Sequence, residues 1–329
     1  MLETTRPEIR HARVPSLVYN ALVRTARLQN YRPTAWAWQW LWQASSGLFT
    51  SPVQTKLHGR TVLLNYGNTY PVNCRRHPLL NAALIEVVYQ VFSTRNLPIA
   101  VVDVGAATGD TLLLLQERCP KMIDRFYCID GDPEFFGYLR HNLRHLTNGT
   151  LLMALLSSEH GHVGELVRIH AGTASAQGKA TVPAMTLDEV LLPLKLSRLD
   201  VLKSDVDGYD GKALRGATTL LRTFRPAVVF EWHPILCQQT SNPWTDHFEA
   251  LEACGYSVYL WFTKFGHFSH FMFGYDKPGV GALAELCLRN NHGTDWHYDV
   301  VALHSSSALS YTSLAELMFA RAARLKGAS

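Results

Sequence analysis

Residues 99–111 read IAVVDVGAATGDT, an apolar run around Asp103 that leads into a glycine-containing turn. Such a run is typical of a strand that is buried on both faces of a parallel sheet. Gly105 and Gly109 let the backbone turn tightly, so that a ligand can lie against it. Together with the leucines that follow, the stretch predicts a strand, a turn and a helix, the opening unit of a nucleotide-binding α/β fold.

The residues of this turn indicate which cofactor it binds. A nicotinamide-dinucleotide site requires the motif G-x-G-x-x-G, whose glycines let the N-terminus of a helix contact a pyrophosphate. In this chain Ala107 occupies the position of the second glycine. A cofactor with an ammonium and a ribose but no phosphate, such as S-adenosylmethionine (SAM), suits the acidic strand end better. The stretch resembles the first motif of SAM-dependent methyltransferases. Asp110 or Thr111 is expected to cap the helix. The residues expected to contact the cofactor here are Asp103, Gly105, Ala106, Gly109, Asp110 and Thr111.

The composition is that of a globular protein with a sizeable core. The 329 residues are 47% hydrophobic and 18% charged, and the net charge of +4 is too small to indicate nucleic-acid binding. The six cysteines form no C-x-x-C pair, which argues against a zinc site. No apolar stretch resembles a signal peptide or is long enough to span a membrane, so we expect a cytoplasmic protein.

We expect two parts, an N-terminal extension over residues 1–97 and a methyltransferase domain over residues 98–329. The extension is expected to hold helices and a small hairpin that pairs Thr61–Asn65 with Thr69–Val72. Its residues 34–43 read TAWAWQWLWQ; the alternation favours a strand, whereas the alanines and glutamines favour a helix. We interpret this stretch as a helix buried against the main domain, with a homodimer contact or a lid over an acceptor as the alternatives.

Strand and helix patterns alternate through the rest of the chain. This alternation predicts an α/β protein with a doubly wound, mostly parallel, Rossmann-like sheet. Ligands in such sheets bind beyond the carboxyl ends of the strands. Four predicted strands end in a carboxylate, namely Asp103, Asp130, Asp205 and Glu231. Because an unpaired charge is costly to bury, four such acids are not expected there by chance, and they predict a polar ligand.

Asp130 is the candidate ribose ligand. It follows Gly105 at roughly the spacing at which an acid meets a ribose in βαβ nucleotide sites. A carboxylate can accept hydrogen bonds from both ribose hydroxyls, and Gly131 allows a close backbone approach. The structural alternative is a helix N-cap, a role that suits Asp132 better because Pro133 follows it. Asp103 and Gly105 are expected near the amino-acid end of the cofactor.

A second acidic cluster, SDVDGYD, follows the predicted fourth strand at residues 204–210. Asp205 and Asp207 are candidates for binding the cofactor ammonium, for removing a proton from an acceptor hydroxyl, or for holding a divalent ion. Glu231 and His233 end the fifth strand and point to the same side, which makes them further catalytic candidates. The alternative for His233 is a structural histidine. A metal is not favoured, but Asp205, Asp207 and Glu231 would supply oxygen ligands to Mg²⁺.

Taken together, these motifs resemble the FkbM-like family of SAM-dependent methyltransferases. The matching segments, in the family's order, are VVDVGAATGDT (101–111), IDGDP (129–133), MTLDEVL (185–191), LDVLKSDVDGYDGKALRGA (199–217) and PAVVFEWHP (226–234). The resemblance covers Val101–Pro234. The chain departs from the family at Ala107-Thr108, where asparagine-isoleucine is usual, and has aspartates at 130 and 207 where glutamates are usual. These changes keep the acids but leave the acceptor geometry open.

The resemblance implies O-methylation of a hydroxyl on a small molecule, a sugar or a natural-product scaffold. Catalysis would then consist mainly of aligning the hydroxyl and removing its proton, with Asp205 or Asp207 as the base and His233 next. The alternatives are a non-catalytic partner protein with a SAM-binding fold and a nicotinamide-dependent oxidoreductase. A nucleic-acid methyltransferase is disfavoured because no Asn-Pro-Pro-Tyr type of motif follows the fourth strand. We expect no nucleic-acid partner, and a homodimer is the default assembly.

Overall fold

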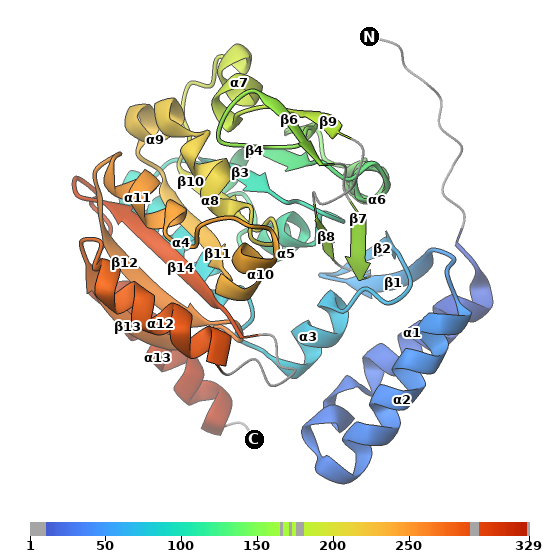
Figure 1. Cartoon of the computed structure of the whole chain (residues 1–329). Helices are drawn as coiled ribbons and strands as arrows, with labels where there is room; N and C mark the ends of the chain where they lie inside the picture. The colour runs from blue at the N-terminus through green and yellow to red at the C-terminus, as the bar shows by residue number, and fades with distance from the viewer. Residues whose placement is uncertain (1–10, 165–166, 171–172, 176–180, 290–295, 328–329) are drawn as a thin grey trace.

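A mixed eight-stranded sheet forms the centre of the molecule (Figure 1). The computed structural model describes residues 11–164, 167–170, 173–175, 181–289 and 296–327. In spatial order the strands are β13 (Phe268–Phe273), β12 (Tyr256–Thr263), β14 (Tyr298–His304), β11 (Ala227–Trp232), β10 (Val201–Ser204), β3 (Ile99–Val104), β4 (Ile123–Asp130) and β5 (Gly149–Met153). The strands from β11 to β5 are parallel, whereas β14 runs antiparallel to both β11 and β12. The predicted α/β fold with a mostly parallel sheet is confirmed.

β3 lies inside the sheet because apolar cores cover both of its faces. All of its residues are buried, and Val101 belongs to one core while Val102 belongs to the other. The helices that cover the sheet in the first core are α4 (Ala82–Arg95), α5 (Asp110–Arg118), α6 (Pro133–Leu143) and α13 (Tyr311–Gly327), and residues of the N-terminal helices join the same core. Those of the second are α8 (Asp210–Arg215), α9 (Thr218–Phe224), α11 (Asp246–Glu252) and α12 (Lys277–Arg289). With both faces covered, ligand access is left to the edge at which the strands end.

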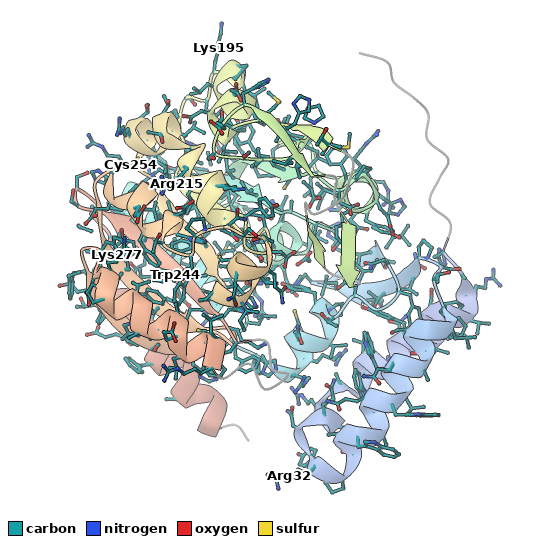
Figure 2. The ribbon with its side chains drawn as sticks, viewed as in Figure 1. Arg32, Lys195, Arg215, Trp244, Cys254 and Lys277 are labelled. Atoms are coloured by element: carbon teal, nitrogen blue, oxygen red, sulfur yellow. The ribbon has the colours of Figure 1, made fainter. Side chains whose placement is uncertain are left out.

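The N-terminal extension begins with two helices that lie side by side and project from the body of the sheet (Figure 1). They are α1 (Arg13–Arg24) and α2 (Arg32–Leu48), and residues 13–48 are called the arm below. Figure 2 shows Arg32, at the start of α2, on the tip of the arm, away from the strands. The arm is followed by the hairpin β1 (Val53–Leu57) and β2 (Arg60–Leu64) and by helix α3 (Tyr70–Arg76).

The predicted hairpin between Thr61–Asn65 and Thr69–Val72 is therefore wrong. β2 pairs with the strand before it, around a turn at His58 and Gly59 in which both residues have a positive φ. The segment after β2 instead enters α3, with Pro71 in its first turn. Proline favours this position because its fixed φ is helical and its missing N–H is not needed there.

The tryptophan-rich stretch forms helix α2, as predicted, but only part of it is buried. Trp38 is 6% exposed and stacks on Trp42, with ring centroids 5.2 Å apart. Trp36 and Trp40 are 73% and 59% exposed. The helix is confirmed, but its buried side packs within the extension, where Trp38 Nε1 donates to Leu22 O of α1 at 3.2 Å, so the predicted burial against the main domain is not what the structure shows. Trp36 and Trp40 stay exposed because a helix turns side chains at every second position to different faces.

Asn142 fastens the hairpin to the glycine turn. Its side-chain Oδ1 accepts from Leu63 N at 2.8 Å, and its Nδ2 donates to Leu63 O at 2.9 Å and to Thr108 O at 2.8 Å. The amide group thus pairs with β2 as a neighbouring strand would. A second long-range contact, the ion pair between Glu86 on α4 and Arg321, holds the C-terminal helix α13 against α4.

The segment His160–Gly178, whose glycines predict an excursion or an edge hairpin, lies outside the main sheet. β6 (Gly161–Gly164) pairs with β9 (Thr181–Ala184), and β7 (Val167–His170) pairs with β8 (Thr173–Ser175). Residues 165–166, 171–172 and 176–178 of this segment lie outside the described residues. None of the helices in the described ranges is long and apolar enough to cross a membrane.

Candidate functional site

A cavity of about 860 Å³ opens at the carboxyl ends of the parallel strands. Its floor consists of the segments that follow β3, β4, β5 and β10, and its wall is made by α2 and residues 67–73. Seven of the predicted site residues line it: Gly105, Asp110, Thr111, Asp130, Gly131, Asp205 and Asp207. Asp103, Ala106, Gly109, Glu231 and His233 do not line it.

The glycine turn is pinned to the strand beside it. The N–H groups of Gly105 and Ala106 both donate to Ile129 O, at 2.9 and 3.0 Å. Gly105 has φ +77°, and a Cβ there would lie 1.9 Å from Asp205 O, so the position requires glycine. The helix cap differs from the expectation: Gly109 is the N-cap of α5, and Asp110 lies in its first turn and accepts from Thr108 Oγ1 at 2.9 Å.

Asp130 reaches back to the same turn. Its Oδ2 accepts from Ala107 N at 2.7 Å, and its Oδ1 accepts from Asp132 N at 2.8 Å. Burial raises the pKa of Asp130 to about 6, although these two backbone hydrogen bonds favour the charged form. Each carboxylate oxygen keeps a further lone pair that can accept from a ligand. Asp132 caps α6 by accepting from Glu134 N and Phe135 N, as the sequence predicted.

A buried lysine joins two of the predicted acids. Lys203 on β10 is the register partner of Asp103 on β3, and its Nζ lies 3.2 Å from Asp103 Oδ1 and 3.3 Å from Asp205 Oδ2. The side chains of Asp103 and Lys203 are almost fully buried, whereas that of Asp205 is 48% exposed. Asp103 therefore lies behind Lys203, and Lys203 and Asp205 face the cavity.

The loop after β10 is shaped by an acid that has no contact with the cavity. Asp210 is completely buried and accepts from Ser204 Oγ at 2.6 Å and from Val206 N at 3.2 Å. Burial, followed by the charge of Asp205, raises the pKa of Asp210 to about 7. Asp207 adopts a positive φ of 51° in the same loop and lines the cavity. The loop thus presents Asp205 and Asp207 to the space above β3 and β10.

Glu231 and His233 lie one strand farther along the sheet and away from the cavity lining. A carboxylate oxygen of Glu231 lies 3.3 Å from His297 Nε2, and its register partner on β14 is Asp299. Burial, then the charges of the neighbouring aspartates, raises the pKa of Glu231. His233 is the N-cap of α10 (Pro234–Gln239), where its Nδ1 accepts from Leu236 N at 3.3 Å, and its ring lies 4.9 Å from that of His297.

These placements bear on the alternative that a divalent ion is bound. In the ranges that the structure describes, no group of three His, Cys, Asp or Glu side chains is arranged to hold a metal ion. Asp205, Asp207 and Glu231, the ligand set that the sequence offered, are accordingly not gathered around one point.

Several cavity-lining residues were not anticipated, and most lie outside the region of the family resemblance. Trp42, Gln43 and Ser46 come from α2, and Ser46 Oγ is buried with no hydrogen-bond partner in the described part of the chain. Others include Asn68, Tyr70, Asn73, Phe135, Leu155 and Tyr209. The tryptophan pattern was the one available signal for α2, and it did not show which tryptophan faces the ligand.

The volume and the charge of the cavity are compatible with SAM. A volume of about 860 Å³ lies in the range of small-molecule sites. The described lining carries five carboxylates and one ammonium, which favours a ligand with a cationic centre over a phosphate. Gly131 lies so close to residues 154–155 that a Cβ there would be 2.8 Å from Leu155 Cδ1, so the backbone forms a narrow slot next to Asp130.

Residues 103–258 match the family model described as the Methyltransferase FkbM domain. No curated protein matches the chain. Among solved structures, it is similar to methyltransferase FkbM from Methylobacillus flagellatus KT, with 14% identity and a TM-score of 0.40 over 62% of this chain and 43% of that one. The chain thus spans less than half of that relative's length.

Two further solved structures give similar values. They are a precorrin-6y C5,15-methyltransferase from Geobacter metallireducens GS-15 (16% identity, TM-score 0.33, covering 67% of this chain and 87% of that chain) and a fibrillarin from Aeropyrum pernix in complex with S-adenosyl-L-methionine (11% identity, TM-score 0.36, covering 62% and 66%).

Proposed function

Starting from the FkbM methyltransferase domain that residues 103–258 form, we propose that the chain transfers a methyl group from SAM to a hydroxyl oxygen of a small, uncharged acceptor. The observation that supports this most strongly is the joint geometry of the glycine turn and Asp130. The turn has no room for a side chain at Gly105, and the carboxylate at the end of β4 faces the cavity. Such an arrangement binds a nucleoside without requiring a phosphate.

The chain's own residues have three tasks in this reaction. Asp130 accepts from the ribose hydroxyls, and the Gly105 turn provides the surface against which the cofactor lies. The bound SAM supplies an activated methyl group, so that alignment and proton removal are what the protein adds. Asp205 and Asp207 are the two candidate bases in the cavity, and an oxygen of Asp205 lies 3.3 Å from Lys203 Nζ.

The acceptor lies against the wall formed by α2 and residues 67–73. The wall offers the aromatic rings of Trp42 and Tyr70, the amide of Asn73 and the unpartnered hydroxyl of Ser46. It contains no charged side chain among the lining residues that the structure describes. An uncharged hydroxylated molecule meets both features, whereas a phosphorylated one would face the carboxylates of the floor. The arm is thus the lid over the acceptor.

The test is calorimetric titration with S-adenosylhomocysteine (SAH), using two matched carboxylate variants. The wild type is expected to bind with micromolar affinity. Asp130→Ala should weaken binding by about 30-fold, since it removes a charged acceptor of two hydrogen bonds. Glu231→Gln is the control. Glu231 lies on β11 and away from the cavity, so the SAH affinity of this variant should stay within about twofold of that of the wild type.

Two outcomes would contradict the proposal. If the wild type does not bind SAH with or without Mg²⁺, the methyltransferase function is wrong, and titration with a nicotinamide cofactor becomes the next measurement. If SAH binds but no hydroxyl compound is methylated across a broad acceptor panel, the chain is a non-catalytic SAM-binding protein.

A further inference from the structure

The outer side of helix α2 is apolar and exposed. Trp36 and Trp40 lie one helical turn apart, so they point to the same side of the helix, and Leu41 and Leu48 continue this exposed side. These four residues are called the outer face of α2 below. Trp38, on the other side of the helix, packs inside the extension. A contiguous exposed apolar surface of this kind indicates an interaction site.

The N-terminal extension carries positive charge without negative charge. Residues 11–85 contain eight arginines and lysines and no aspartate or glutamate, whereas the rest of the chain contains 23 basic and 27 acidic residues. The arm and the turn between its helices hold four of these arginines, all exposed: Arg13, Arg24, Arg27 and Arg32. None of them forms an ion pair with an acidic residue in the described ranges. Their charge is therefore available to a negatively charged partner.

The positive charges adjoin the exposed apolar side chains. Arg32 lies one turn before Trp36 on α2, and Figure 2 shows it at the tip of the arm. On α1, the exposed residues Arg13, Leu17 and Arg24 share one side of the helix, because they are spaced by four and seven residues. The arm thus presents tryptophan and leucine side chains with arginines at their borders.

This combination fits an anionic lipid surface better than other partners. Tryptophan prefers the boundary between lipid headgroups and acyl chains, and arginine binds anionic headgroups. A second copy docked through the same face would bring arginines opposite arginines, and the extension has no acid between residues 11 and 85 to pair with them. A nucleic acid requires positive charges that follow its backbone, but the chain has no charged residue between Arg32 and Lys56.

We propose that the arm binds the anionic lipid surface of a membrane. The outer face of α2 inserts among the lipid headgroups, and the arginines of the arm contact the lipid phosphates. Gln43 and Gly47 of the same helix line the cavity, so this docking holds the cavity close to the lipid surface. The inference goes beyond the proposed function and does not depend on it, because lipid binding by the arm needs no cofactor.

The test is flotation of the full chain with two kinds of vesicle, one of phosphatidylcholine alone and one of phosphatidylcholine and phosphatidylglycerol in equal amounts. The wild type should bind the mixed vesicles about 100-fold more tightly, since each arginine near an anionic surface contributes about fivefold. Trp36→Ser combined with Trp40→Ser should weaken binding to the mixed vesicles about 30-fold. Phe273→Ser combined with Phe319→Ser is the matched control, because these rings are 62% and 58% exposed but lie outside the arm. Its binding should stay within about twofold of that of the wild type.

A second variant tests the charges and leaves the tryptophans in place, so it also decides the matter if the tryptophan variant does not fold. Arg13→Gln combined with Arg24→Gln and Arg32→Gln should bind the mixed vesicles about 100-fold more weakly than the wild type. Equal binding of the wild type to both kinds of vesicle, or binding that this variant retains, overturns the inference.

Two further results would also overturn the inference by assigning the arm to another partner. One is a wild type that binds no vesicles but forms a dimer in analytical ultracentrifugation, with the dimer lost in the tryptophan variant. The other is a wild type that binds no vesicles but binds a single-stranded oligonucleotide, with this binding lost in the arginine variant. Because the flotation contains neither SAM nor SAH, none of these outcomes bears on the proposed methyl transfer.

Discussion

Asp130 and Glu231 lie near the carboxyl ends of two parallel strands of one sheet, yet only Asp130 faces the cavity. β4 lies next to β3, and the glycine turn after β3 leaves the cavity open at the carboxyl ends of these two strands. β11 instead lies next to the antiparallel β14, whose first residues therefore meet the end of β11. His297 and Asp299 come from that segment and occupy the space beside Glu231.

The difference shows that a carboxylate near a strand end is not enough to identify a ligand site in such a sheet. What matters is whether an antiparallel strand is among the neighbours: β4 has parallel strands on both sides, whereas β11 has the antiparallel β14 on one side, and β14 brings its own side chains to the end of β11. We therefore call these regions the open edge, at β3, β4 and β10, and the filled edge, at β11 and β14. Three predictions test the distinction between them.

The largest effect is expected from Gly105→Ala at the open edge. The new Cβ would lie 1.9 Å from Asp205 O on a backbone with φ +77°, so the turn or the β10 loop must move. Strain and displacement of about 3 kcal/mol should weaken SAH binding about 100-fold in calorimetry. Gly59→Ala is the matched control, because Gly59 has a similar φ of +71° and open space around it. Equal SAH affinity for the two variants would contradict a tight approach at the open edge.

A smaller effect is expected when the pH is lowered. The ligand-free Asp130 has a pKa raised to about 6 by burial, and Asp110, which also lines the cavity, has a pKa of about 6. The ionised Asp130 is the form that accepts from two hydroxyls, so affinity is lost as the pH falls through 6. SAH binding measured by calorimetry at pH 8 and at pH 5 should differ by about tenfold. In Asp130→Asn this difference should shrink, whereas an unchanged pH profile would assign the effect to another group.

The smallest effect is expected at the filled edge and concerns stability instead of binding. Burial, then the charge of Asp205, raises the pKa of Asp299 from the ordinary 3.8 to about 7. The folded protein thus holds this proton more tightly than the unfolded chain, so the stability contributed by the group falls as the pH rises from about 4 to 7. Asp299→Asn should raise the melting temperature by about 2 to 4 °C at pH 8 and change it little at pH 4, close to the ordinary pKa of the group. An equal shift at both pH values would mean that packing, and not ionisation, is responsible.

The sequence predicted the open edge well because its signals are local. The buried run of β3, the glycine turn and Asp130 all lie within residues 99–130. In each case the residue type alone indicates the role: apolar residues for a buried strand, glycine for a tight turn and a carboxylate for a polar ligand. The filled edge was not predicted, because β14 inserts between β11 and β12 from a segment far along the chain. Nothing near Glu231 and His233 in the sequence indicates that His297 and Asp299 arrive beside them. A lid over an acceptor was one of the alternatives that the sequence left for the tryptophan-rich helix. Which of its residues line the cavity depends on how the helix packs in three dimensions, and the local sequence does not show this.

The hydrogen bonds between Asn142 and Leu63 have a consequence for how the chain folds while it is being synthesised. Leu63 and Asn142 are 79 residues apart, so at ribosomal speed roughly 4 to 16 s pass before the partner of β2 is synthesised. A two-stranded hairpin is marginal on its own, and the exposed Trp36 and Trp40 of the preceding helix add apolar surface to the waiting segment. We expect the nascent N-terminal segment to be a chaperone client until α6 emerges. Ribosome-bound chains that stop before Asn142 should therefore be cleaved by protease within the arm, and chains that extend past α6 should resist cleavage.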